Sequence, residues 1–221
     1  MLMVNQATGF GAGAEPPPPA ISAFQGAAAL TGNQSAYSFT NRGLGTPTPD
    51  RRILLWAGGT RSGTASFGAV TIAGVTATLL DSIQTTNRAV GMFIAHVPEG
   101  TSGDISVGFG DGMLQCGIAV WAVYNLLSAV PVDTVLRAVV ASACDFPALA
   151  TAEDGVAVWA CLSSTGTASF TWSTGTERFD AVVEGAVTHS GADMVTTGAS
   201  VTMTATGSAS SLKDGVGVSL R

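Results

Sequence analysis

The chain has 221 residues, of which 46% are hydrophobic and 11% are charged, and its formal net charge at pH 7 is −6. This apolar content excludes intrinsic disorder, because burying so much apolar surface offsets the chain entropy lost on folding. The acidic balance argues against phosphate-rich partners, so we expect neither nucleic-acid binding nor attraction to an anionic membrane. A β-sandwich or barrel of about 200–250 residues commonly forms one domain, and we expect one here.

The first twenty residues predict an extended arm, residues 1–20, in front of a single domain, residues 21–221. Glycines in the first half of this arm favour flexibility. Four consecutive prolines favour a stiff polyproline II rod of about 3.1 Å per residue, and they are Pro16, Pro17, Pro18 and Pro19. We expect the arm to become ordered when a neighbouring subunit supplies a surface. The alternative is a disordered tail, and the same composition supports it.

From residue 21 onward, short apolar or alternating runs separated by Gly, Asn, Asp, Ser or Pro predict many short strands. They lie at residues 21–30, 36–40, 52–57, 69–72, 75–80, 90–97, 104–109, 115–124, 134–143, 155–162, 168–172, 178–183, 194–196, 200–205 and 215–220. Residues 126–140 have the one helical pattern, and Pro131 limits it to a single turn. The whole predicts an all-β fold, an antiparallel jelly-roll-like β-sandwich.

Two glycine-containing links have specific predictions. Ala73-Gly74 separates two alternating runs and predicts a tight hairpin. Gly108-Phe-Gly-Asp-Gly112 has the glycines of a phosphate loop, but a strand pattern follows it where such a loop needs a helix. We therefore expect a turn between two antiparallel strands.

A Gly-x-Ala-Val-Trp-Ala frame occurs twice, at residues 117–122 and 155–160. The frame reflects either a duplication or two central strands with convergent packing, and the mismatched flanking residues favour convergence. Either way, Trp121 and Trp159 are predicted core residues, because a tryptophan buries about 200 Å².

Residues with catalytic or ligating chemistry are scattered along the chain. We expect His96 to be structural, because no second ligand occurs at metal-binding spacing. His189 lies near Glu184, Asp180 and Asp193, which either bind Ca²⁺ through their oxygens or are solvated loop carboxylates. No serine has the Gly-x-Ser-x-Gly setting of a nucleophile. We expect no enzymatic activity, no cofactor and no metal.

Four arginines fall within twenty residues of a chain with only nine basic residues, and they are Arg42, Arg51, Arg52 and Arg61. One interpretation is a solvated strand end. The other is a bidentate anchor for the carboxylates of a partner subunit, because arginine is enriched at interfaces. With the prolines of the arm, they are the candidate interface residues.

The order of several segments is informative. It runs Ser35-Ala-Tyr-Ser-Phe-Thr, Pro49-Asp-Arg-Arg-Ile-Leu-Leu, Val70-Thr-Ile-Ala-Gly-Val-Thr-Ala-Thr, Ala95-His-Val-Pro-Glu-Gly-Thr-Ser-Gly-Asp-Ile-Ser-Val and Cys116-Gly-Ile-Ala-Val-Trp. This succession resembles β-sandwich virion structural proteins of tailed bacteriophages and prophages, over residues 35–220. The resemblance implies a subunit of the virus particle, a capsid-surface decoration or head spike first and a tail or baseplate component second. The resemblance supplies no catalytic residues. We expect the chain to work as a homo-oligomer that contacts capsid or tail subunits.

Two other functions stay open at this point. One is a carbohydrate-binding module or receptor-binding head, for which Trp56, Trp172 and Tyr37 are candidates if their rings face solvent. The other is a glycan hydrolase, which needs paired carboxylates across a groove. We expect synthesis in the reducing cytoplasm of the bacterial host, so Cys116, Cys144 and Cys161 should be buried and unlinked.

Overall fold

The computed structural model describes residues 15–61, 63–164, 169–183 and 187–221. Every regular element in this part of the chain is a β-strand, which confirms the predicted all-β class. The strands are β1 (Ile21–Gly43), β2 (Arg52–Thr60), β3 (Phe67–Ile72), β4 (Val75–Thr76), β5 (Thr78–Gln84), β6 (Arg88–His96), β7 (Ser102–Tyr124), β8 (Asp133–Asp145), β9 (Glu153–Ser163), β10 (Phe170–Trp172), β11 (Thr176–Val183), β12 (Val187–Thr197) and β13 (Thr204–Leu220).

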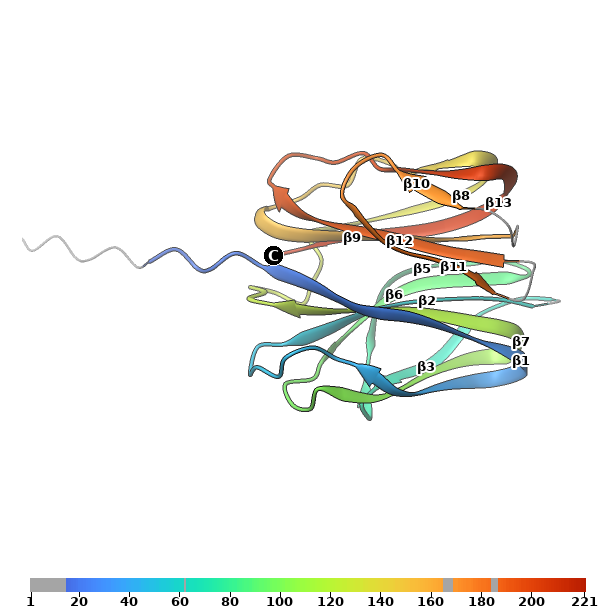
Figure 1. Ribbon diagram of the computed structural model, residues 1–221, viewed down its shortest axis with the longest axis horizontal. Helices are drawn as coiled ribbons and strands as arrows, with labels where there is room; N and C mark the ends of the chain where they lie inside the picture. The colour runs from blue at the N-terminus through green and yellow to red at the C-terminus, as the bar shows by residue number, and fades with distance from the viewer. Residues whose placement is uncertain (1–14, 62, 165–168, 184–186) are drawn as a thin grey trace, which may run out of the picture.

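The strands form two antiparallel sheets that pack face to face, so the predicted sandwich is confirmed (Figure 1). The first sheet has the order β4-β3-β7-β2-β6-β5, with β1 also paired to β7. The second has the order β10-β13-β9-β12-β11, with β8 also paired to β13. Each sheet comes from one continuous half of the chain, and the halves appear as the blue-to-green and yellow-to-red layers of Figure 1.

The two halves have the same topology. In each half the first and last strands pair with each other. The second strand lies between the last strand and one strand of a hairpin. A short strand also pairs with the last strand. In this sense β1, β2, β6 and β7 correspond to β8, β9, β12 and β13. Across the interface β1 contacts β11, and β5 contacts β8, which are equivalent contacts in the repeat. The sandwich is therefore a pseudo-dimer within one chain.

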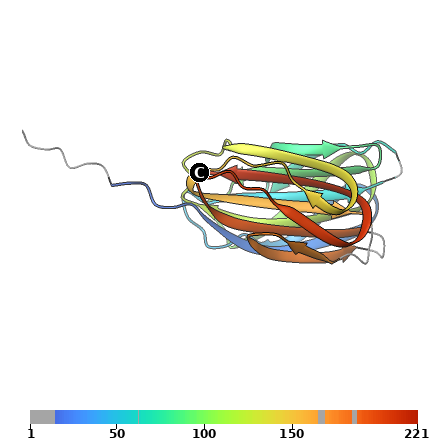
Figure 2. The same cartoon turned by 90° about the horizontal axis from the view of Figure 1, so that it is seen from above.

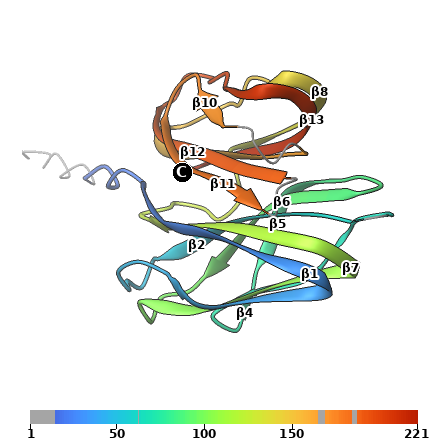
Figure 3. The same cartoon turned by 45° about the vertical axis from the view of Figure 1, so that its right-hand side comes forward.

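The long strand pairs also share one irregularity. Gly108 and Met113 pair with Ala36 and Gln34, so residues 109–112 lie opposite Ser35 alone. Thr206 and Ser211 pair with Ala143 and Ala141, so residues 207–210 lie opposite Ser142 alone. An excess of residues on one strand bends a ladder and increases its twist. Each long pair thereby curls back over its own sheet, as the view in Figure 3 shows for β1 and β7.

Because each half curls over itself, the described residues form three hydrophobic cores. One lies inside the first half and includes Tyr37, Ile53 and Ile118. The middle core lies between the two sheets and includes Trp56, Trp121 and Val158. The third lies inside the second half, and Trp159 packs there. The view from above in Figure 2 shows the strands of the two layers running nearly along one direction, as in aligned sandwich packing.

The predicted tryptophan positions are correct, because Trp121 and Trp159 are both fully buried on central strands. They face different cores, however: Trp121 points between the sheets and Trp159 into the second half. The repeated sequence frame lies on β7 and β9, which are not equivalent strands. The frame therefore does not trace the structural repeat.

Several local predictions are resolved. Ala73 and Gly74 form the predicted hairpin link between β3 and β4, both with positive φ. The predicted turn at residues 108–112 is wrong, because this segment is the bulge inside continuous β7. No helical turn occurs between residues 126 and 140, where a loop leads into β8. Consecutive predicted strands form the single continuous strands β1, β7 and β13, because the bulges in these strands bend the ladders without ending the pairing.

Candidate interaction surface

The root of the arm is fixed at one end of the sandwich. Ala20 is buried and donates its N–H to the carbonyl of Asp154 at 2.8 Å. The Asn125 side chain donates to the Pro19 carbonyl at 3.0 Å, and Arg221 donates to the Pro18 carbonyl at 3.1 Å. Glu15 and the four prolines are exposed and lead away from the body (Figure 1). Residues 1–14 of the predicted arm lie outside the described residues.

An apolar loop lies beside this root. Residues 125–132 connect the two halves, and the loop is tied to the last strand because Arg221 and Ser219 accept backbone N–H groups from Ser128 and Val132. Leu127, Val130 and Val132 are nevertheless 61%, 74% and 46% exposed. We call the arm root (residues 15–20), this loop and Arg221 the arm end. Exposed apolar side chains gathered on one surface are typical of contacts with other proteins.

The arm end and its surroundings are also acidic. Glu15, Asp50, Glu99, Glu153 and Asp154 are exposed there. Asp50 accepts the backbone N–H of Asn125 at 2.6 Å, and this hydrogen bond is the main reason why the pKa of Asp50 is lowered. Asp50 is therefore ionised at neutral pH. Acidic side chains gathered at one end favour a partner surface with basic side chains.

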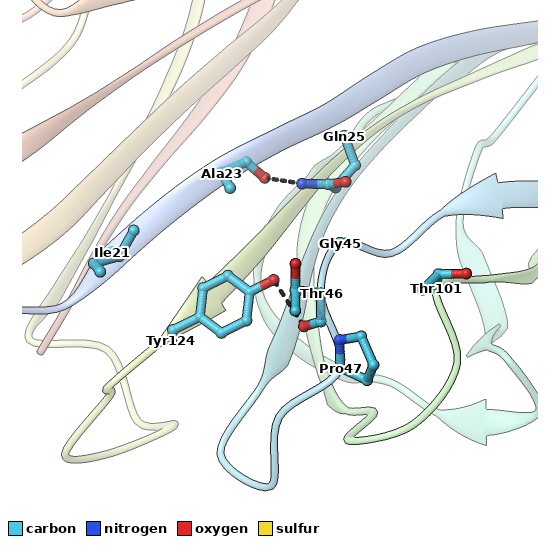
Figure 4. A pocket seen from close by; sticks show the side chains of 8 residues that line it. All are labelled: Ile21, Ala23, Gln25, Gly45, Thr46, Pro47, Thr101 and Tyr124. Atoms are coloured by element: carbon cyan, nitrogen blue, oxygen red, sulfur yellow. Dashed lines mark hydrogen bonds between the residues drawn. The ribbon is translucent and has the colours of Figure 1, made fainter.

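A hollow of about 570 Å³ lies next to the arm root (Figure 4). The start of β1 forms one wall, the end of β7 contributes Tyr124, and two loops close the other side. The Tyr124 hydroxyl donates to the Thr46 carbonyl at 3.0 Å, which fixes the ring against the hollow. Gly45 has a φ of 76°, and a Cβ there would lie 2.6 Å from the Tyr124 hydroxyl, so a larger residue would displace the ring.

Arg51 is not available to a partner, which corrects its place among the interface candidates. Its side chain is fully buried and donates to the carbonyls of Gly45, Val97, Glu99 and Gly100 at 2.7–2.8 Å. Carbonyl acceptors from separate loops compensate the cost of burying this charge. Arg51 therefore holds together the loops around the hollow.

The other three arginines are not brought together. Arg52 begins β2 at the end of the sandwich that carries the arm, whereas Arg61 follows β2 at the opposite end and pairs with Asp111 at 2.8 Å. Arg42 donates to the Ala27 carbonyl at 3.2 Å, where the two ends of the bent β1 approach each other. All three are partly exposed, so their interface role stays a prediction, but they do not form one anchor.

The aromatic residues considered for sugar binding are in the interior. Trp56 and Tyr37 are fully buried, and Trp172 is 9% exposed with its N–H donated to Ser190. None of these rings faces solvent, so none forms a stacking platform. Tyr124 is the aromatic side chain that lines the hollow, and its place at the end of a predicted central strand gave no sign of this exposure.

The histidine and carboxylate cluster does not form a metal site among the described residues. Asp193 is buried, pairs with Arg178 at 2.8 Å and accepts the Trp121 N–H at 2.8 Å. Asp180 accepts the backbone N–H of Phe170, and Glu184 lies outside the described residues. His96 is exposed, with Nε2 2.8 Å from the Pro49 carbonyl oxygen.

His189 and the three cysteines are buried. Burial lowers the pKa of His189 to about 3, so its imidazole is neutral between the sheets. Cys116, Cys144 and Cys161 are free thiols, as predicted. Burial raises the pKa of Cys144 to about 12 and raises those of the other two as well. Thiols with such pKa values are poor nucleophiles at neutral pH.

Comparisons with known proteins gave little. No family model matches the chain, and no curated protein matches it. Among solved structures, it is similar to the crystal structure of the PBSX exported protein XepA, with 11% identity over 90% of this chain and 86% of that chain, and a TM-score of 0.23. A likeness at this TM-score supports no assignment. No helix long and apolar enough to cross a membrane occurs in the described ranges.

Proposed function

We propose that this chain is a structural subunit of a tailed-phage particle, attached through its arm end. A decoration or head-spike subunit on the capsid surface is the first placement, and the tail or baseplate is the second. The chain acts without catalysis or cofactor, binds no nucleic acid or membrane, and works as a homo-oligomer in contact with capsid or tail subunits. It is made in the bacterial cytoplasm and ends in the virion.

The particle assignment is supported by the resemblance of residues 35–220 to phage β-sandwich proteins. The low charge of the chain suits a subunit whose surfaces meet neighbours. The observation that carries the mode of attachment is the fixed arm root, where three hydrogen bonds hold residues 18–20 against β9, the 125–132 loop and the chain end. A rod that starts from a fixed root loses less entropy on docking than a free tail.

Two truncations test this attachment. Removal of residues 1–14 leaves the root intact, and removal of residues 1–19 eliminates the contacts to Asn125 and Arg221. Both proteins should fold, as circular dichroism would report, because both truncations keep every strand that the structure describes. We expect the protein that lacks residues 1–19 to be missing from purified particles, as quantitative mass spectrometry would show. Its incorporation at normal stoichiometry would show that the arm is dispensable.

A matched pair of surface substitutions tests the apolar loop. Val130→Ser and Val140→Ser remove similar side chains that are 74% and 68% exposed, and only Val130 belongs to the arm end. Val130→Ser should lower incorporation, whereas Val140→Ser, on β8, should not. Equal incorporation of the two variants would contradict attachment through this end.

A further inference from the structure

We propose that the hollow beside the arm root binds a neutral saccharide. The proposal is separate from the structural role and does not rest on it. The hollow is lined by eight residues and none is charged, in a molecule whose surrounding end carries five exposed carboxylates. An uncharged lining favours an uncharged ligand, because a charged one would lose hydration without gaining an ion pair.

The lining combines one aromatic ring with neutral hydrogen-bonding groups. Tyr124 supplies the ring, and its hydroxyl is held by the Thr46 carbonyl. The Thr46 and Thr101 hydroxyls have no hydrogen-bond partner in the part of the chain that the structure describes. Gln25 donates its amide N–H to the Ala23 carbonyl at 2.9 Å, so its oxygen is left as an acceptor. Donors and acceptors thus surround an apolar wall.

Pyranoses match this arrangement. A sugar ring has an apolar C–H face that packs on an aromatic side chain, and its hydroxyls both donate and accept hydrogen bonds. Figure 4 shows Tyr124 and Ile21 on one side of the hollow and Thr46, Pro47 and Thr101 on the other. The site is pre-formed, because Arg51 and Gly45 fix the loop that carries Thr46. Binding therefore requires little ordering of the protein.

A proline-rich peptide is the competing occupant, since the exposed prolines of a second copy carry the right shape for an aromatic groove. The observations favour the saccharide. A proline ring has no hydroxyl that could donate a hydrogen bond to the Gln25 oxygen. The hollow also has one aromatic ring, whereas polyproline grooves are lined by several. The arm prolines of the same chain do not fill it, because they line a separate hollow beside Asp154.

The two tyrosines of the chain provide a direct test. Labelling with 3-fluorotyrosine gives two ¹⁹F resonances, one from Tyr124 in the hollow and one from Tyr37, which is fully buried. Tyr124→Phe assigns them. Methyl α-glucopyranoside, methyl β-galactopyranoside, methyl α-mannopyranoside and N-acetylglucosamine are titrated at millimolar concentrations. We expect at least one to shift the Tyr124 resonance saturably and to leave the Tyr37 resonance unchanged.

A hydroxyl deletion provides the matched control. Thr101→Val keeps the shape of the side chain and should weaken binding of the active saccharide about tenfold, the effect of one lost hydrogen bond. Thr78→Val, exposed on β5 outside the hollow, should leave binding unchanged. The proposal is overturned if no saccharide shifts Tyr124 saturably, if both threonine variants behave alike, or if a peptide of residues 15–20 shifts Tyr124 where the sugars do not.

Discussion

Trp121 and Trp159 are equally buried but differ in one contact. The Trp121 N–H donates to the buried carboxylate of Asp193, whereas the Trp159 N–H has no partner among the described residues. Truncation of either to Ala should cost about 3–5 kcal/mol, because it empties a large volume in a core. A milder substitution separates the contribution of the Trp121–Asp193 hydrogen bond from the effect of lost volume.

Trp121→Phe and Trp159→Phe remove the same atoms. The first should destabilise the protein by about 1.5–3 kcal/mol more than the second, because it also removes a hydrogen bond to a charged group. Urea denaturation followed by far-UV circular dichroism measures both. Equal costs would show that the Asp193 bond adds nothing to stability.

His189 gives the protein a defined pH dependence. Its pKa is about 3 in the folded state and 6.5 in a model peptide, because burial disfavours the imidazolium. Between these values the unfolded chain binds more protons, so stability falls as the pH drops from about 6.5 toward 3, by up to about 1.4 kcal/mol per pH unit. His189→Gln should flatten this part of the profile. Equal slopes for the wild type and the variant would contradict the burial argument.

Arg51 shows why some residues were misplaced from sequence. Its neighbours Pro49, Asp50 and Arg52 are exposed or partly exposed, and three of the four carbonyls that accept from its guanidinium belong to the distant segment 97–100. Local sequence contains no trace of such non-local acceptors. The cysteines were placed correctly because each lies among apolar or small neighbours in a strand, and that information is local.

At the level of elements, the shared bulges are held in different ways. Lys213 is fully buried and donates to the carbonyls of Ala141 and Ala209 and to the Ser211 hydroxyl, at 2.6–3.0 Å, which fixes residues 207–210. The first half instead has Tyr37, whose hydroxyl donates to the Met113 carbonyl at 2.5 Å beside residues 109–112.

Lys213→Met should therefore loosen one bulge and leave the other unchanged. We expect a loss of about 1–3 kcal/mol, because buried carbonyls lose their donor. Hydrogen exchange should accelerate at residues 207–210, with residues 109–112 of the same molecule as the control. Exchange that accelerates equally in both bulges would indicate general destabilisation rather than loss of a local anchor.

Sequence patterns identified most strands but not their lengths or their partners. Alternation is a local property, so it located β2, β6, β9 and the β3–β4 hairpin. Strand β12 was mostly missed, because its buried residues include His189, Ser190 and Asp193, which do not read as a core face. The hollow was not predicted at all, since its lining comes from four separate segments that only the fold brings together.

At the scale of the whole molecule, the two halves are joined by a shared core. The middle core contains side chains of both sheets, and Arg88 of the first half pairs with buried Asp214 of the second. If the two halves separated, each would expose its apolar side chains of the middle core, and the Arg88–Asp214 ion pair would be broken, so separation is unfavourable. We therefore predict that residues 21–221 unfold as one domain despite the internal repeat.

Cooperativity is measured by following one transition with several probes. Far-UV circular dichroism, near-UV circular dichroism and tryptophan fluorescence should give coincident urea midpoints. Two of the four tryptophans, Trp56 and Trp121, report on the middle core, and Trp159 and Trp172 report on the second half. Separate midpoints would show that the repeats are two domains that unfold independently.

We propose that this chain is a structural subunit of a phage particle. Quantitative mass spectrometry of gradient-purified particles, compared with the unassembled protein of the same lysate, tests it most directly. We predict that the chain co-purifies with the particle at a constant copy number relative to the major capsid protein. Recovery of the chain in the unassembled fraction, with none in the particles, would contradict this role.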